Sequence, residues 1–479
     1  MKQFLNFRQS FNVLQISVYI LLFGFYSVNL ASQMVFIGDQ GWFYLSAKDL
    51  LLGKEFPLVG IPSSHPWLHQ GAYWTYLLAI ALAIGRFDPI AGGYMGILFG
   101  ILGVAAVYFV TKKFFTRKAA FIATLLYATS PLVVAHARMP YHTTPIPFFT
   151  TLYIYSLLQW IKGKVIFFPI SLSLLAILYN FEIATVLLVF PFLLIAAYGL
   201  IKKTKWFIPI LNKKIIFTSY GAIILPMIPM LLFDLEHGFP QTLKFIAWVG
   251  YRILVLLGYP PLHPEIPSPS KEFFYIFSLD KLTYYFLPSN TYLAILIFLG
   301  IIIGSTVYTI KSLFASKINT SFLIIYLITI CSLLGYVINQ TPSEAYLPIL
   351  FSPLMMLAGF LANVIIKKRG FFYPTLVAVS IIVITNIIFI WKVHSIENQA
   401  GITFRQRMEV VEKIIKKIGK RPYSLHAIGE GSQFESFLDN YRYLLWWKKY
   451  PPLPNPQKIQ VVLKEEKNKI QIIYKGIKE

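Results

Sequence analysis

The sequence predicts an all-α polytopic membrane protein that carries a small α/β domain after its last span. Of its 479 residues, 57% are hydrophobic and only 13% are charged, too few charges for the surface of a soluble chain of this length. Apolar stretches of about twenty residues recur, each long enough to cross about 30 Å of hydrocarbon. After residue 391 the composition becomes polar and charged. We therefore assign 1–391 to a transmembrane domain and 392–479 to a tail domain.

About eleven transmembrane helices are expected from the apolar segments. They lie near residues 12–36, 89–110, 118–136, 146–161, 165–180, 183–200, 215–233, 291–310, 320–338, 347–366 and 371–391. The apolar stretch 71–86 is too short for a comfortable span. We expect it, and the amphipathic stretch Trp42–Leu52, to form juxtamembrane helices. Two long loops remain on one side of the membrane, a first outer loop over 37–88 and a second over 234–290.

The net charge of +23 is divided unevenly between the two sides of the expected spans. Most Lys and Arg residues before residue 392 fall in short connections such as TKKFFTR (111–117), whereas every Asp and Glu in that range falls on the opposite side. The positive-inside rule places the basic side in the cytoplasm. We expect a plasma (inner) membrane protein with its N-terminus inside and its tail outside. The basic residues then face membrane lipids, and no nucleic acid is expected as a partner.

The tail predicts an α/β order of elements. A helix is expected over Phe404–Ile418, a strand near Tyr423–Ile428, a helix over Phe434–Tyr450, and strands over Ile459–Leu463 and Lys469–Tyr474. The last two segments alternate polar and apolar residues, which is typical of strands with one buried face. We expect a small extracytoplasmic domain.

An acidic residue follows the first span directly, in IGDQGWFYLSAKDLLLG (37–53). Asp39 lies where the chain leaves the lipid, a position at which a partly buried carboxylate can act as a base. The competing interpretation is that Asp39 caps the helix over Trp42–Leu52, a role worth about 1 kcal/mol. Gln40 and Tyr44 lie close to it in the sequence and are further candidates for the same site.

Three more segments follow in a recognisable order: HQGAYWTYLLAIALAIGRFDPIA (69–91), VTKKFFTRKAAFIATLLYATSPLVVAHAR (110–138) and EAYLPILFSPLMMLAG (344–359). Together with the Asp39 motif they resemble the GT-C membrane glycosyltransferases. The resemblance is to the branch of protein O-mannosyltransferases and lipid A aminoarabinose transferases, and it covers most of residues 12–366. Order and pattern carry it, because each motif is weak alone. It implies that 1–391 is a GT-C-like domain.

The resemblance implies an enzyme that moves a hexose or pentose from a polyprenyl-phosphate-linked donor to a hydroxyl of a lipid, glycan or protein. Transfer would occur on the extracytoplasmic face by inverting displacement, with Asp39 as base. Cations must then bind the departing phosphate. Arg138 fits because guanidinium binds phosphate bidentately, although it could instead reach to lipid headgroups. Weaker candidates on the same side are His65, His69, His136, His142 and Arg252, and for each histidine a hydrogen-bonded interface role is the competing interpretation.

Glu182 lies between the fifth and sixth spans, where a charge is costly. It indicates either a site residue or a structural partner for Arg138. No metal-ligand spacing is visible, so no metal or other cofactor is assigned. Asp39, Glu182 and the histidines would nevertheless supply ligands for a divalent ion if they converged.

Three departures from the family pattern predict a donor or acceptor unlike those of its well-known members. Gln40 stands where the family often has Glu, His142 and Thr143 stand where it often has a second Asp, and Glu344 replaces a basic residue before the late tyrosine. Two alternatives stay open. A transporter would place ionisable groups at mid-membrane and repeat its halves. A non-catalytic scaffold or receptor would suit the tail and the absent second acid.

Overall fold

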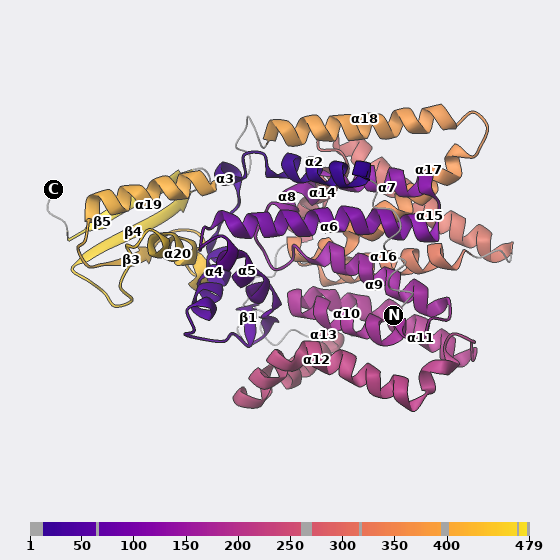
Figure 1. Ribbon diagram of the computed structural model, residues 1–479, viewed down its shortest axis with the longest axis horizontal. Coiled ribbons are helices and arrows are strands. Elements are labelled where there is room, and N and C mark those ends of the chain that lie inside the picture. Colours follow the sequence, from indigo (N-terminus) through magenta and orange to yellow (C-terminus); the bar gives the residue numbers. More distant parts are fainter. Residues whose placement is uncertain are drawn as a thin grey trace.

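The computed structural model describes residues 13–63, 67–259, 271–315, 319–393, 402–466 and 469–476. Most of them are helical (Figure 1). The α-helices are α2 (Val13–Ser27), α3 (Leu30–Gln33), α4 (Gly38–Leu51), α5 (Tyr73–Ile84), α6 (Ile90–Phe114), α7 (Arg117–Ala128), α8 (Pro131–Ala137), α9 (Ile146–Ile161), α10 (Phe167–Phe181), α11 (Val189–Ile201), α12 (Lys213–His237), α13 (Phe245–Leu256), α14 (Lys271–Phe286), α15 (Thr291–Phe314), α16 (Thr320–Asn339), α17 (Pro348–Ile366), α18 (Phe372–Trp391), α19 (Phe404–Ile418) and α20 (Asp439–Trp447).

Short helical turns join several of these helices: η2 (Ile183–Leu188), η3 (Ile208–Leu211), η4 (Pro240–Lys244), η5 (Glu344–Tyr346) and η7 (Glu435–Leu438). The segment 234–290, expected to be a long loop, is therefore mostly helical, because α12 continues to His237 and η4, α13 and α14 follow. Most of the proline-rich stretch 258–270 lies outside the described residues.

Eight helical stretches in the described ranges are long and apolar enough to cross a membrane. Helices α7 and α8, bent by 64° at the break between them, are together long and apolar enough for either one broken span or a re-entrant loop. The bend has a local cause, since Pro131 lacks the N–H that would continue the hydrogen-bond ladder. The shorter apolar helices α9 and α10 occupy the two remaining expected spans. The predicted all-α polytopic membrane fold is confirmed.

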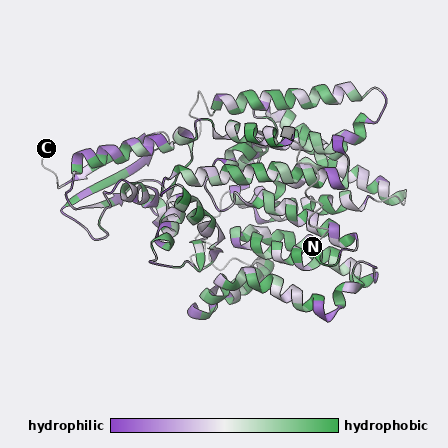
Figure 2. Ribbon diagram, viewed as in Figure 1, coloured by the Kyte–Doolittle hydropathy of each residue, from purple (hydrophilic) through white to green (hydrophobic). Residues whose placement is uncertain are grey.

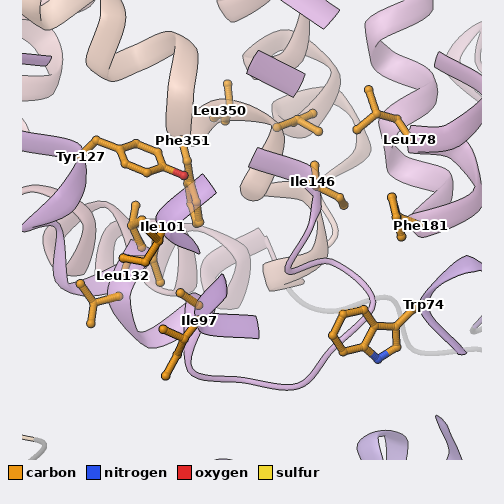
Figure 3. Packing of buried hydrophobic residues seen from close by; sticks show 14 of the residues in the cluster. Trp74, Ile97, Ile101, Tyr127, Leu132, Ile146, Leu178, Phe181, Leu350 and Phe351 are labelled. Carbon is orange, nitrogen blue, oxygen red and sulfur yellow. The ribbon is translucent and has the colours of Figure 1, made fainter. Parts of the chain in front are cut away.

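The helical body is built around α6 and α17, the most buried of these spans. α12 and α18 lie at opposite edges (Figure 1), where many of their apolar side chains are exposed, as expected for helices that face lipid. The core includes Trp74, Tyr127 and Phe351 (Figure 3). Close helix contact depends on small residues: a Cβ at Gly359 of α17 would lie 2.5 Å from the carbonyl oxygen of Ala119 in α7.

One end of the helical body carries the extramembrane elements, and we call it the sheet end (Figure 1). β1 (Val59–Pro62) and β2 (His69–Gly71) pair antiparallel beside α4 and α5. The tail forms a sheet of β3 (Tyr423–Ala427), β4 (Ile459–Glu466) and β5 (Lys469–Lys475), in the order β3-β4-β5. β3 and β4 are parallel, as their connection through α20 allows, and β4 and β5 are antiparallel. The tail is visibly more hydrophilic than the spans (Figure 2).

The tail elements lie close to their expected positions, with one difference. The helix expected over 434–450 is divided into the turn η7 and α20. This division brings the tail backbone against α4: a Cβ at Gly41 would lie 1.9 Å from the Asn440 nitrogen, and one at Gly38 would lie 2.2 Å from the Ser436 oxygen. Two glycines therefore permit the contact on which the site described below depends.

Candidate functional site

The first turn of α4 positions Asp39. The helix begins at Gly38, earlier than the sequence indicated, because the Gln40 side chain accepts a hydrogen bond of 3.0 Å from the backbone N–H of Ile37. Asp39 thus lies inside the helix and is not its N-cap, and the helix dipole favours its negative charge there. Gln40 itself is buried.

The Asp39 carboxylate is half-buried and accepts hydrogen bonds from two hydroxyl groups. Oδ2 accepts from the Tyr141 OH at 3.2 Å, and Oδ1 accepts from Ser436 Oγ at 2.8 Å. Each carboxylate oxygen has about two lone-pair sites, so each retains one for a further donor. Asp39 can therefore accept a proton or a hydrogen bond from a ligand without losing either partner.

A second acid, Glu182, is held differently. It is buried, and its Oε1 accepts from the Ala184 backbone N–H at 3.1 Å. Its Oε2 accepts from Gln70 Nε2 at 3.1 Å and bonds His142 Nε2 at 2.9 Å. Gln70 also accepts from the Ile183 backbone N–H at 3.0 Å. Donors thus satisfy both carboxylate oxygens, as a buried charge requires.

Two adjacent residues connect these acids. Tyr141 bonds Asp39 and His142 bonds Glu182, with their ring centroids 4.0 Å apart and Phe43 packed against both rings. Burial raises the pKa of Tyr141 well above its ordinary value, and the negative charges of Asp39, Glu182 and Glu344 raise it further. Tyr141 therefore remains a neutral hydroxyl donor at physiological pH. The other ring nitrogen of His142, Nδ1, is buried and has no hydrogen-bond partner among the described residues.

A third acid borders the same residues. Glu344 begins η5, which packs against η2, the turn whose N-cap is Glu182. The side chain of Glu344 is partly exposed and forms an ion pair of 2.6 Å with Lys281 of α14. The negative charges of three acids from distant parts of the chain thus act on Tyr141.

Arg138 makes its described contacts outside this cluster. It is buried, and its Nη1 donates to the backbone carbonyl oxygens of Tyr26 and Val28, the latter at 2.9 Å. These carbonyls lie at the end of α2, where helix geometry leaves carbonyl groups without intrahelical partners. A phosphate-binding role for Arg138 stays a prediction, and the contacts supply a structural role that the sequence did not indicate.

The remaining candidates lie in different surroundings. Tyr44 is fully buried, donates to the Pro89 carbonyl at 2.6 Å and packs edge-on against Tyr443 of α20. His69 bonds the Gly60 carbonyl at 3.2 Å, and burial lowers its pKa. His136 is buried in α8. His65 and the side chain of Arg252 lie outside the described residues. Within the described ranges, no three His, Cys, Asp or Glu residues are arranged to hold a metal ion.

Sequence reasoning named Asp39, His142 and Glu182 but missed three of their partners. Gln70 lies in the motif at residues 69–91, so the sequence did contain a signal for it. Tyr141 lies beside His142, in the stretch where the second acid of the family was expected. Ser436 carried no signal, because 397 residues separate it from Asp39.

Comparison with known proteins supports the fold. Residues 69–233 match the family described as dolichyl-phosphate-mannose-protein mannosyltransferase. No curated protein sequence matches the chain significantly. Among solved structures, ArnT from Cupriavidus metallidurans bound to undecaprenyl phosphate has a TM-score of 0.60 at 10% identity, covering 94% of this chain and 92% of that one. The Archaeoglobus fulgidus oligosaccharyltransferase in its apo form has a TM-score of 0.53 at 12% identity, covering 94% of this chain and 65% of that one. The chain therefore has the fold of the GT-C membrane glycosyltransferases, as the sequence resemblance indicated.

Proposed function

We propose that the chain transfers a sugar from a polyprenyl-phosphate-linked donor to an acceptor hydroxyl, with Asp39 as the base. The matching family is named for a dolichyl-phosphate-linked mannose, and the ArnT structure holds undecaprenyl phosphate. Both are polyprenyl phosphates, which supports the same donor class here. The observation that carries the assignment to Asp39 is its half-buried carboxylate, which retains acceptor sites in its hydrogen-bond arrangement.

Glu182 is less suited to be the base, because it is buried and already accepts from three donors, whereas the half-buried Asp39 accepts from two. An acceptor hydroxyl would have to displace Gln70 or His142 to reach its Oε2. Asp39 requires no such displacement. We assign Glu182 the role of holding His142 and Gln70 in place.

In the proposed reaction the acceptor oxygen attacks the anomeric carbon, and the bond from that carbon to the phosphate oxygen breaks. Asp39 takes the proton of the acceptor hydroxyl, and the polyprenyl phosphate leaves with the bonding electron pair. Attack opposite the leaving group inverts the anomeric centre. Because phosphate leaves as a stable anion, no general acid is needed, which is consistent with a single available carboxylate. Tyr141 and Ser436 hold Asp39 in the required orientation.

Transfer of radiolabelled sugar in proteoliposomes tests the proposal. A panel of undecaprenyl-phosphate-linked sugars would be supplied as donors, and label would be followed into lipid, glycan and protein fractions of added membranes. We expect Asp39→Asn to lower turnover by roughly 10²–10⁴-fold with an unchanged melting temperature, because it removes the base while keeping the shape. Asp49→Asn, in the same helix, is the matched control. Wild-type turnover in Asp39→Asn would exclude Asp39 as the base, and wild-type protein that transfers no sugar would reject the function.

The proposal places the sheet end outside the cytoplasm. The support is the distribution of charge in the sequence, with basic residues in the short connections at the opposite end. A reporter enzyme that is active only outside the cytoplasm, fused after residue 476, should be active. The same reporter inserted between Lys202 and Lys203 should be inactive. The reverse pattern would place Asp39 on the cytoplasmic side.

A further inference from the structure

We propose that Lys281 of α14 binds the phosphate of the polyprenyl donor, and that Glu344 holds Lys281 in place while the site is empty. The inference rests on the proposed function for its substrate class and adds a residue that the sequence did not single out. It commits to a lipid-linked phosphate as the ligand. Its basis is the partly exposed Lys281–Glu344 pair, where Glu344 begins the turn η5 that packs against η2.

The ion pair is accessible to a ligand. Lys281 Nζ lies 2.6 Å from Glu344 Oε1, and the two side chains are 21% and 47% exposed. The same ammonium lies 3.7 Å from Asp280 and over the ring of Phe277. Partly exposed ion pairs contribute little net stability, so exchanging the partner has a low cost. An ammonium has three donors, and it can begin to bind a phosphate before it releases the carboxylate.

The pair lies near the Glu182 end of the candidate site. Glu344 begins η5, which packs against the turn capped by Glu182, and its charge also acts on Tyr141. The helix that carries Lys281 is fixed in position. Tyr285, one turn further along α14, accepts from Ser130 Oγ at 2.7 Å and donates to the Phe351 carbonyl at 2.6 Å. Lys281 is therefore presented from a rigid element.

A cation near these acids would favour binding of a negatively charged donor. Asp39, Glu182 and Glu344 together would repel a negatively charged donor, because like charges across a binding site are unfavourable. Two other described cations are engaged elsewhere: Arg138 with the end of α2, and Lys48 with Asp49 at 3.1 Å. Lys281 has a partner that a stronger anion can replace. A donor phosphodiester carries one negative charge and the departing monoester carries up to about two, so attraction to Lys281 grows as the reaction proceeds.

Binding of undecaprenyl phosphate, which carries no sugar, tests the inference apart from transfer. The full chain would be purified in lipid nanodiscs, and affinity would be measured by native mass spectrometry. We expect Lys281→Met to raise the Kd at least tenfold and Lys281→Arg to stay within threefold of wild type. Lys271→Met, an exposed position on the same helix, should have no effect. Glu344→Gln should lower the Kd, because it removes the competing anion. Uncharged undecaprenol should not distinguish Lys281→Met from wild type.

Equal affinity of Lys281→Met and wild type would overturn the inference, and so would equal weakening by Lys271→Met. Melting temperatures identify any variant that fails to fold, and Lys281→Gln then replaces Lys281→Met. If binding depends on Lys281 while no sugar is transferred, the proposed function fails and the phosphate site stands. If transfer depends on Asp39 while binding is independent of Lys281, only this inference fails.

Discussion

The two acids of the candidate site differ in how the chain holds them. The Asp39 end is assembled from α4, the loop before α9 and the turn η7 of the tail, and its carboxylate is half-buried with hydroxyl partners only. The Glu182 end draws its partners from residues 70–184, and its carboxylate is buried with amide and imidazole partners. A buried carboxylate that accepts from three donors contributes to structure. One with acceptor sites to spare is available for chemistry.

Replacing Glu182 should have the largest effect on stability. Glu182→Ala leaves Gln70, His142 and the Ala184 N–H without their acceptor in a buried position, so we expect a loss of about 3 kcal/mol or more. Thermal unfolding of the solubilised protein measures this loss of stability, and Glu236→Ala, at an exposed position, is the control. If Glu182→Ala keeps the wild-type melting temperature but transfers no sugar, Glu182 is a reactive acid and its role is not structural.

The contact between α4 and the tail can be broken separately. In Gly41→Ala the new Cβ would lie 1.9 Å from the Asn440 nitrogen, and backbone atoms must move to relieve this overlap. We expect a loss of about 2–3 kcal/mol, faster proteolysis of the tail and reduced transfer. Gly24→Ala is the control, because a Cβ there meets no atom within 4 Å. If proteases cleave the tail of Gly41→Ala no faster than that of the wild-type protein, α4 and the tail pack less closely than these distances indicate.

Arg138 belongs to neither end of the site, and its replacement separates the two roles considered for it. Lysine cannot reproduce the guanidinium geometry that serves the Tyr26 and Val28 carbonyls. We expect Arg138→Lys to lose about 1–2 kcal/mol of stability and to bind undecaprenyl phosphate normally. Unchanged stability with tenfold weaker binding would instead support the phosphate-binding role predicted for Arg138 from the chemistry of its guanidinium group.

The smallest effect should come from Ser436. Ser436→Ala removes one of the two hydroxyl donors to Asp39, and we expect turnover to fall about fivefold, equivalent to about 1 kcal/mol. Ser436→Thr retains a hydroxyl and should restore most of the turnover, which a purely steric role would not produce. Ser432→Ala, whose hydroxyl bonds only the Gly429 carbonyl among the described contacts, is the control. Equal turnover in all these variants would show that Tyr141 alone positions Asp39.

Most of the fold followed from the sequence because membrane spans and amphipathic strands leave periodic signals. The helix α4 was misplaced at its start, since the Gln40 bond that begins it at Gly38 is not part of any periodic pattern. Asp39 and Glu182 could be named because charges near a bilayer are costly and few. Their hydroxyl and amide partners could not, because Tyr141, Ser436 and Gln70 are common residue types. Only the folded chain shows which of them approach a carboxylate.

The distance in sequence between Asp39 and Ser436 has a consequence for biosynthesis. At about 5–20 residues per second, a ribosome adds the 397 residues between them in roughly 20–80 s. All the spans have been synthesised before η7 is made, so a nascent chain holds its membrane helices while Asp39 still lacks one partner. A chain that ended before residue 434 would keep every span and lose that partner. Completion of the tail therefore sets the time at which the Asp39 end of the site can form.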